Sequence, residues 1–252
     1  ERDLEDALDN IFYHPNVGPF VSRQLIQRLV TSNPSREYIA RVASVFNDNG
    51  ANVRGDMKAV IKAILLDPEA RNGNHAQWSM FGHLREPMIQ FITVMRAFNA
   101  RSYSGKWPVW DLDRDMGQAA FRAPSVFNFF SPDYSPEGMI KNLGLVAPEF
   151  QIANEPQVTG GYNSLRRLIR DRYGFNEMDR LRLDINQELA LANDPAALVH
   201  RLNLLLFAGA LSSDLQQVTR QMIAQIPASD PSRRVRSAIT LLVTSPEFLV
   251  QK

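Results

Sequence analysis

Apolar side chains recur three and four positions apart along most of the chain, which is the pattern of amphipathic α-helices. Leu4, Leu8 and Ile11 form the first such stripe. Further stripes lie in residues 20–29, 38–46, 57–65, 88–98, 165–173, 198–206, 215–223 and 235–242. The pattern predicts an all-α protein with nine to eleven helices.

Capping residues and prolines predict where these helices begin and end. Asn33-Pro34, Asp194-Pro195 and Asp230-Pro231 each combine an N-cap residue with proline at the first helical position. Asp67-Pro68 and Ser245-Pro246 end the preceding stripes, because the residue before proline avoids the α conformation. Short turns separate the helices, so we expect an array of antiparallel helical hairpins.

Residues 101–160 lack this regular pattern and predict a long, aromatic, proline-rich central loop. Within it, aromatic rings with polar neighbours suit stacking on sugars or anchoring a protein partner. The alternative, which we favour, is that the rings turn inward and hold the loop in place. The candidate ligand- or partner-binding residues are Trp107, Trp110, Phe127, Asn128, Phe130 and Tyr134.

Two parts of the chain resemble each other. Residues 23–69 and 200–247 both read as helix, turn, helix, loop, helix, followed by proline and glutamate. This predicts a single helical domain over residues 1–252 that contains two related helical units, 18–70 and 195–250. The alternative is coincidence, because amphipathic helices that end at proline look alike.

Composition excludes several classes of function. Hydrophobic residues make up 44% and charged residues 22%, with a net charge of +1, which is typical of a folded globular protein. A nucleic-acid-binding protein usually has a strong basic excess, which is absent. No apolar run is long enough for a membrane span. Because there is no cysteine, thiolate zinc sites, cysteine nucleophiles and disulfides are excluded.

Three alternating acids, Asp111, Asp113 and Asp115, are similar to the start of a calcium-binding loop. An EF-hand needs glycine at its sixth position and glutamate at its twelfth, where this chain has Met116 and Arg122. A different calcium site remains an alternative, but a solvated acidic turn is the interpretation we favour. We otherwise expect no metal and no cofactor.

Acids of the central region also allow a second hypothesis, a hydrolase that acts on a polymer. The acids concerned are Asp111, Asp113, Asp133, Glu137 and Glu149. No nucleophile elbow, phosphate-binding loop or dinucleotide fingerprint accompanies them. The catalytic residues are therefore unknown, and the sequence favours a protein that is not an enzyme.

Arginines gather in two clusters that could each bind an anionic partner. One cluster is Arg166, Arg167, Arg170 and Arg172, and the other is Arg233, Arg234 and Arg236. The balanced net charge favours the alternative, in which they solvate exposed helix faces and form ion pairs.

Several segments of the chain form long and specific motifs. One is Pro124-Ser125-Val126-Phe127-Asn128-Phe129-Phe130. The others are residues 14–17, 23–34, 54–60, 65–71, 85–87, 132–134, 148–151 and 245–251. In these segments and in their order, the chain resembles a bacterial family called domain of unknown function 1800.

This resemblance implies that the chain is the C-terminal half of a longer protein, which is often exported to the periplasm or the exterior. Such proteins are often encoded beside domain of unknown function 1501, which resembles sulfatases or phosphatases. The family offers no catalytic residue to transfer. We expect a non-enzymatic scaffold or partner-binding protein, whose partner is the missing N-terminal half or the companion family. A hydrolase component or a carbohydrate-binding module is the alternative.

Overall fold

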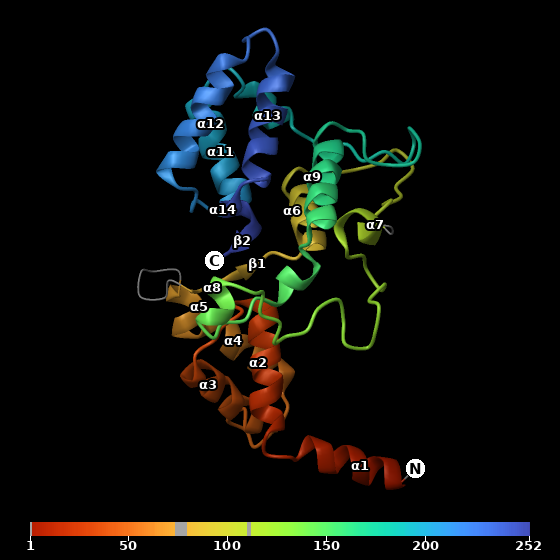
Figure 1. Ribbon diagram of the computed structural model, residues 1–252, viewed down its shortest axis with the longest axis vertical. Helices are drawn as coiled ribbons and strands as arrows, with labels where there is room; N and C mark the ends of the chain where they lie inside the picture. The colour runs from red at the N-terminus through yellow and green to blue at the C-terminus, as the bar shows by residue number, and fades with distance from the viewer. Residues whose placement is uncertain (1, 74–79, 110–111) are drawn as a thin grey trace. The chain divides into compact units, whose positions relative to one another are not determined.

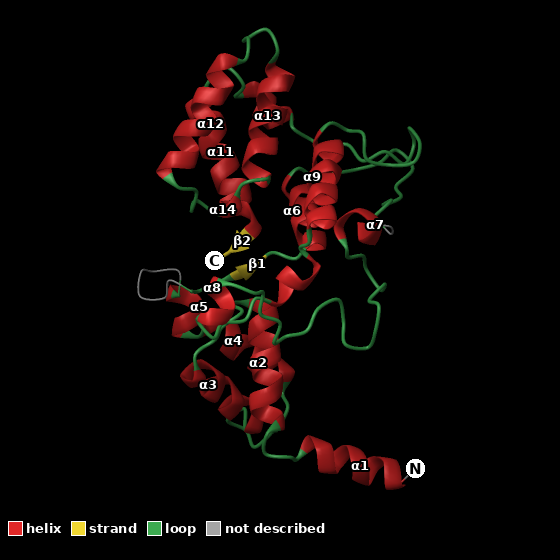
Figure 2. Ribbon diagram, viewed as in Figure 1, coloured by secondary structure: helices red, strands yellow, loops and turns green. Residues whose placement is uncertain are grey.

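The computed structural model describes residues 2–73, 80–109 and 112–252, and it is mostly helical (Figures 1 and 2). Helix accounts for 57% and strand for 3%, so the predicted all-α class is confirmed. Nine helices within the described ranges have ten or more residues. None of the described helices has both the length and the apolar composition that a membrane crossing requires.

The long helices are α1 (Arg2–Phe12), α2 (Val17–Leu29), α3 (Arg36–Asn47), α4 (Met57–Leu66), α6 (Pro87–Ala97), α9 (Glu155–Ile169), α11 (Pro195–Phe207), α12 (Ser213–Gln225) and α13 (Pro231–Val243). The short ones are α5 (Pro68–Asn72), α7 (Leu112–Met116), α8 (Met139–Asn142), α10 (Asn186–Ala190), α14 (Pro246–Leu249) and the 3-10 helix η1 (Pro148–Ile152). Strands β1 (His83–Leu84) and β2 (Val250–Gln251) pair in a two-stranded sheet.

The chain divides into two compact units where we expected a single domain. The first unit comprises residues 1–83, 131–148 and 251–252, and the second comprises residues 84–130 and 149–250. The predicted related segments fall in different units, 18–70 in the first and 195–250 in the second.

In the first unit, α2, α3 and α4 pack around one core (Figure 1). The buried side chains of this core include Ile26, Tyr38, Val42, Phe46, Val60 and Ile64. The Tyr38 hydroxyl donates to the Ile64 carbonyl at 2.7 Å, so the one polar atom of this ring is satisfied inside the core. Helix α1, by contrast, leaves Leu4, Leu8 and Ile11 exposed.

The predicted N-cap at Asn33-Pro34 is wrong, because α3 begins two residues later. Ser35 is the cap, and its Oγ accepts from the Tyr38 amide at 3.0 Å. The Asn33 side chain is engaged elsewhere: it donates to the Val146 carbonyl at 2.8 Å and accepts from the Val146 amide at 2.9 Å. Asn33 thus fixes the 131–148 segment rather than starting a helix.

In the second unit, α9 packs against α7 and α13, while α11, α12 and α13 lie side by side (Figure 1). Their shared core includes Phe91, Leu112, Met116, Leu165, Leu168, Leu198, Leu202, Val235 and Ile239. The predicted caps Asp194 and Asp230 accept backbone hydrogen bonds at the starts of α11 and α13, and Ser212 does the same at the start of α12.

Helix α9 begins ten residues before the expected stripe at Leu165, inside the predicted central loop. Asn154 caps it by accepting from the Gln157 amide at 3.1 Å. Gly160 lies so close to the Asp115 carbonyl of α7 that a Cβ there would be 1.9 Å from that oxygen. The first turns of α9 therefore owe their place to close contact with α7, which needs a glycine rather than an apolar side chain.

The two predicted related segments make the same tertiary contact. In the first unit Glu69 accepts hydrogen bonds from the amide and hydroxyl of Ser35, the cap of α3. In the second unit Glu247 accepts the same two bonds from Ser212, the cap of α12. The relation between the segments stays a prediction, but both use a serine–glutamate link to hold a hairpin.

Candidate anion-binding site

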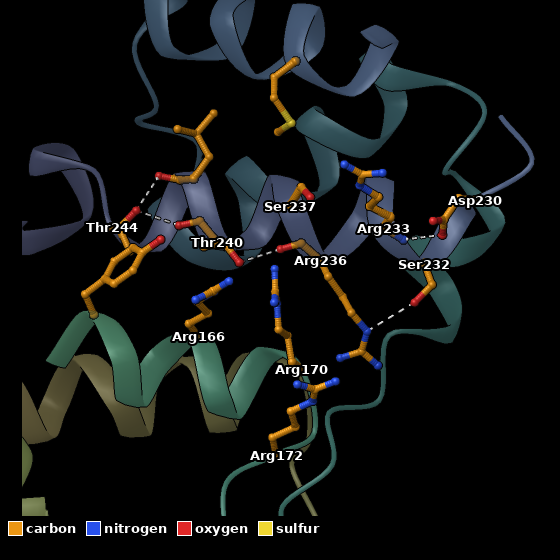
Figure 3. Close-up of a pocket in the computed structure, with 13 residues that line it drawn as sticks. Arg166, Arg170, Arg172, Asp230, Ser232, Arg233, Arg236, Ser237, Thr240 and Thr244 are labelled. Atoms are coloured by element: carbon orange, nitrogen blue, oxygen red, sulfur yellow. Dashed lines mark hydrogen bonds between the residues drawn. The ribbon is translucent and has the colours of Figure 1, made fainter. Parts of the chain in front are cut away.

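A pocket of about 720 Å³ lies between α9 and α13 in the second unit (Figure 3). Five arginines line it: Arg166, Arg170, Arg172, Arg233 and Arg236. They come from the two clusters that are more than 60 positions apart in the sequence. Among the described residues that line the pocket, Asp230 is the one acid.

The fold of α9 directs its arginines into this pocket. Leu165, Leu168 and Ile169 are buried, so Arg166 and Arg170 lie on the opposite, exposed face. Residues four apart in a helix are neighbours on its surface. Both side chains extend from α9 toward α13 (Figure 3). The C-terminal end of a helix also carries partial negative charge, which favours cations there.

Helix α13 contributes the facing arginines from its first turns. Asp230 caps the helix by accepting from the Arg233 amide at 2.9 Å. The N-terminal end of a helix carries partial positive charge, so Arg233 adds to a potential that is already positive. The start of α13 therefore adds to the positive charge that the arginines bring to the pocket.

Four of the five guanidinium groups have no ion-pair partner within the part of the chain that the structure describes. Arg236 is fixed, because it pairs with Asp171 at 2.5 Å and donates to the Ile169 carbonyl. For Arg166, Arg170, Arg172 and Arg233, no described residue forms an ion pair with the side chain or accepts a hydrogen bond from it. All four are exposed to solvent. Their N–H donors are available to a ligand.

The remaining two arginines of the clusters have structural roles. Arg234 is buried and donates to the Ile226 carbonyl at 2.8 Å and to the Ala192 carbonyl at 3.1 Å. Arg167 forms an ion pair with Asp115 of α7. Sequence reasoning identified all seven arginines, but it favoured the solvated interpretation and did not bring the two clusters together.

The aromatic candidates have different environments. Trp107 is 52% exposed and Phe127 81%, whereas Phe130 is only 2% exposed and belongs to the core. Tyr134 is half-buried and lies in the first unit. Asn128 is exposed and has a positive φ of 74°. Trp110 lies outside the described residues. Binding by these residues stays a prediction, and the favoured inward orientation applies to Phe130 but not to Phe127.

The acidic candidates are largely engaged with other side chains. Asp113 pairs with Arg122 at 3.3 Å, and Asp115 accepts from Ser164 at 2.9 Å besides its pair with Arg167. Asp111 lies outside the described residues. Among the residues that are described, no three His, Asp or Glu side chains are grouped as a metal site requires. The calcium alternative stays a prediction.

The proposed hydrolase acids are divided between the two units. Asp133 and Glu137 lie in the first unit, and Glu137 pairs with Lys141 there. A hydrogen bond from Ser131 lowers the pKa of Asp133 below its ordinary value, which favours a carboxylate rather than a proton donor. Asp113 and Glu149 lie in the second unit, where Glu149 is buried.

Comparison with known families identifies the family to which this helical chain belongs. A family described as protein of unknown function (DUF1800) matches residues 1–250. The chain belongs to the DUF1800 family. The resemblance seen in the sequence segments is thereby confirmed across essentially the whole chain. Neither a curated protein nor a solved structure matches the chain. Because the DUF1800 description assigns no activity, the arginine-lined pocket has to be interpreted from its own chemistry.

Proposed function

We propose that this DUF1800 protein is a non-enzymatic binding protein that holds an anionic ligand in the arginine-lined pocket. The observation that carries the proposal is the convergence of four exposed guanidinium groups on one cavity, none of which pairs with an acid among the described residues. Guanidinium is planar and always charged, and its paired N–H donors match two oxygens of a phosphate, sulfate or carboxylate. The expected ligand class is therefore an oxyanion.

Electrostatics supports a ligand here. Like charges four positions apart on a helix, such as Arg166 and Arg170, destabilise it by about 0.2–0.5 kcal/mol. Arg233 adds an unfavourable interaction with the positive end of α13. A bound oxyanion would remove both effects, so the same residues that weaken the empty protein would stabilise the occupied one.

The family resemblance supplies the expected setting. We propose that the protein acts as an exported scaffold in the periplasm or outside the cell. Its proposed partner is the N-terminal half of the longer protein or a member of the companion family. Support for this setting is the resemblance alone, whereas the pocket supports the ligand chemistry.

Thermal unfolding in phosphate and in sulfate tests anion binding. A ligand at one hundred times its dissociation constant stabilises the folded state by about 2.7 kcal/mol. We expect the Tm to rise with phosphate or sulfate beyond the rise seen in sodium chloride of equal ionic strength. The double variant Arg170→Gln, Arg233→Gln should lose this extra rise.

Arg96→Gln is the matched control, because Arg96 is an exposed arginine in the last turn of α6, away from the pocket. It should keep the full response. Equal Tm shifts in chloride and phosphate, or an unchanged phosphate response in the double variant, would show that the pocket does not bind anions.

A further inference from the structure

A second pocket in the same unit has the opposite chemistry. It has a volume of about 400 Å³, and apolar side chains from α7, η1, α9, α13 and α14 dominate its lining. These include Met116, Ile152, Val158, Leu165, Val243 and Leu249. Met116, Leu165 and Val243 are buried and form the floor, whereas Val158 is 58% exposed at the rim. A hydrocarbon ligand would suit this lining.

The two pockets share a wall. Tyr162 of α9 and Thr244, just after α13, line both of them. A ligand in either pocket would therefore contact these same two residues. Tyr162 presents an apolar ring and a polar hydroxyl, which is appropriate where an apolar region meets a polar one.

One face of α9 changes from apolar to cationic along this path. Val158, Tyr162, Arg166 and Arg170 follow one another at intervals of four residues, so they lie in one row on the helix surface. The row covers about 18 Å at 1.5 Å per residue. Its first two side chains line the apolar pocket, and its last three line the arginine-lined pocket.

Helix α13 shows the same change between cationic and apolar side chains, but its cationic end is its start. Arg233 and Arg236 stand at its start, Ser237 and Thr240 follow, and Val243 and Thr244 lie at its end. Figure 3 shows Thr240 and Thr244 at the end of the pocket away from Arg233 and Asp230. Both walls thus lead from arginines through hydroxyl groups to apolar side chains.

We propose that the two pockets together bind a single-chain anionic amphiphile, with its charged headgroup on the arginines and its hydrocarbon chain in the apolar pocket. This inference rests on the proposed function and names its ligand class. Charge complementarity places the headgroup in the arginine-lined pocket, and the apolar lining places the hydrocarbon chain in the second pocket. The headgroup chemistry is a phosphate, sulfate or carboxylate, and the ligand is taken up as a monomer.

Titration calorimetry with alkyl phosphates of eight, ten and twelve carbons, each below its micelle concentration, tests this. Inorganic phosphate and neutral alkyl glycosides of the same chain lengths are the comparison ligands. Full burial of a methylene group contributes about a fourfold gain in affinity. We expect affinity for alkyl phosphates to rise with each added pair of carbons, and the neutral glycosides to bind at least tenfold more weakly.

Variants separate the two halves of the site. Phe150 of η1 lines the apolar pocket together with Val158. Phe150→Asn with Val158→Asn should therefore reduce the gain with chain length while leaving the response to inorganic phosphate unchanged. The control, Leu204→Asn with Val218→Asn, changes apolar residues of similar exposure, 55% and 51% against 41% and 58%, away from both pockets. It should bind alkyl phosphates as the unchanged protein does.

The outcomes distinguish the two proposals. If inorganic phosphate binds in an arginine-dependent way and longer chains add nothing, the amphiphile inference is wrong and the proposed function stands. If no anion binds, both are wrong. If neutral glycosides bind as tightly as phosphates, the headgroup assignment is wrong. Sedimentation with phosphatidylglycerol vesicles without binding of soluble alkyl phosphates would indicate a membrane surface and also overturn the inference.

Discussion

The arginines make different contacts in the two hairpins that a serine–glutamate link holds. These hairpins comprise α2–α5 in the first unit and α11–α14 in the second. In the first, Arg41 of α3 turns back to Asp67, just after α4, and donates two hydrogen bonds of 2.7 and 2.8 Å. In the second, the arginines of α13 reach beyond the hairpin, Arg234 to the Ala192 carbonyl and Arg236 to Asp171.

The difference shows how similar helical frames differ in what they can bind. In the first hairpin, Arg41 is held in an internal ion pair with Asp67. The second hairpin satisfies only part of its charges, and Arg233 remains unpaired among the described residues. Under the proposed function, anion binding therefore depends on which arginines make internal contacts rather than on the helices themselves.

The largest expected difference concerns the two glutamates. Glu69 is buried, whereas Glu247 is exposed. Glu69→Ala leaves the half-buried amide and hydroxyl of Ser35 without their acceptor, so we expect a loss of about 3 kcal/mol in the free energy of unfolding. Glu247→Ala should lose about 1 kcal/mol, because water can replace the carboxylate. Urea unfolding measures both, and equal losses would contradict the comparison.

Removing the internal ion pair should have a smaller effect. Arg41→Gln leaves the buried carboxylate of Asp67 without its cation, but the Arg41 side chain is 49% exposed, so solvent screens the pair. We expect a loss of about 1 kcal/mol, less in high salt. The measurement is urea unfolding at two salt concentrations, with Arg36→Gln, another exposed arginine of α3, as the control.

In the second unit, replacing an unpaired arginine should raise the free energy of unfolding rather than lower it. Arg233→Gln removes a cation from the positive end of α13, so it should stabilise the empty protein by about 0.3 kcal/mol at low ionic strength. Adding salt should abolish the gain. Calorimetric unfolding without phosphate or sulfate would show it. A destabilised Arg233→Gln protein would mean that this arginine is satisfied in the empty pocket.

The smallest effect is a dependence on pH in the first unit. Asp56 caps α4, and a hydrogen bond from Asn49 at 2.7 Å together with the Ala59 amide lowers its pKa. A depressed pKa in the folded state contributes stability above the ordinary carboxyl pKa, and this is lost as pH falls through the folded value. Stability should therefore decline below about pH 4. Asp56→Asn should weaken that decline, as urea midpoints across pH would show.

Sequence patterns predicted the helices well where their ends depend on local chemistry. The side chains of Asp194, Ser212 and Asp230 accept hydrogen bonds from backbone amides two or three residues away, so their capping roles are visible in the sequence. Asn33 was misassigned because its partner, Val146, is 113 positions distant. The beginning of α9 was missed because Gly160 has its role only when α7 lies against it.

The candidate site was predicted only as separate parts. Both arginine clusters stand out in the sequence, but their meeting depends on the packing of α9 against α13. Periodicity also could not separate Arg234, which is buried, from Arg233, which is exposed. The aromatic residues present the same difficulty, because Phe127 and Phe130 share one motif and have opposite environments.

The near contact of Gly160 with the Asp115 carbonyl has a consequence for mutational tolerance. A saturation library at position 160 should return glycine almost alone, whereas we expect the exposed positions of α9 to accept many residues. Even alanine would push α7 away and disturb the pair between Asp115 and Arg167. One absent methyl group thus limits which sequences can adopt this arrangement of helices.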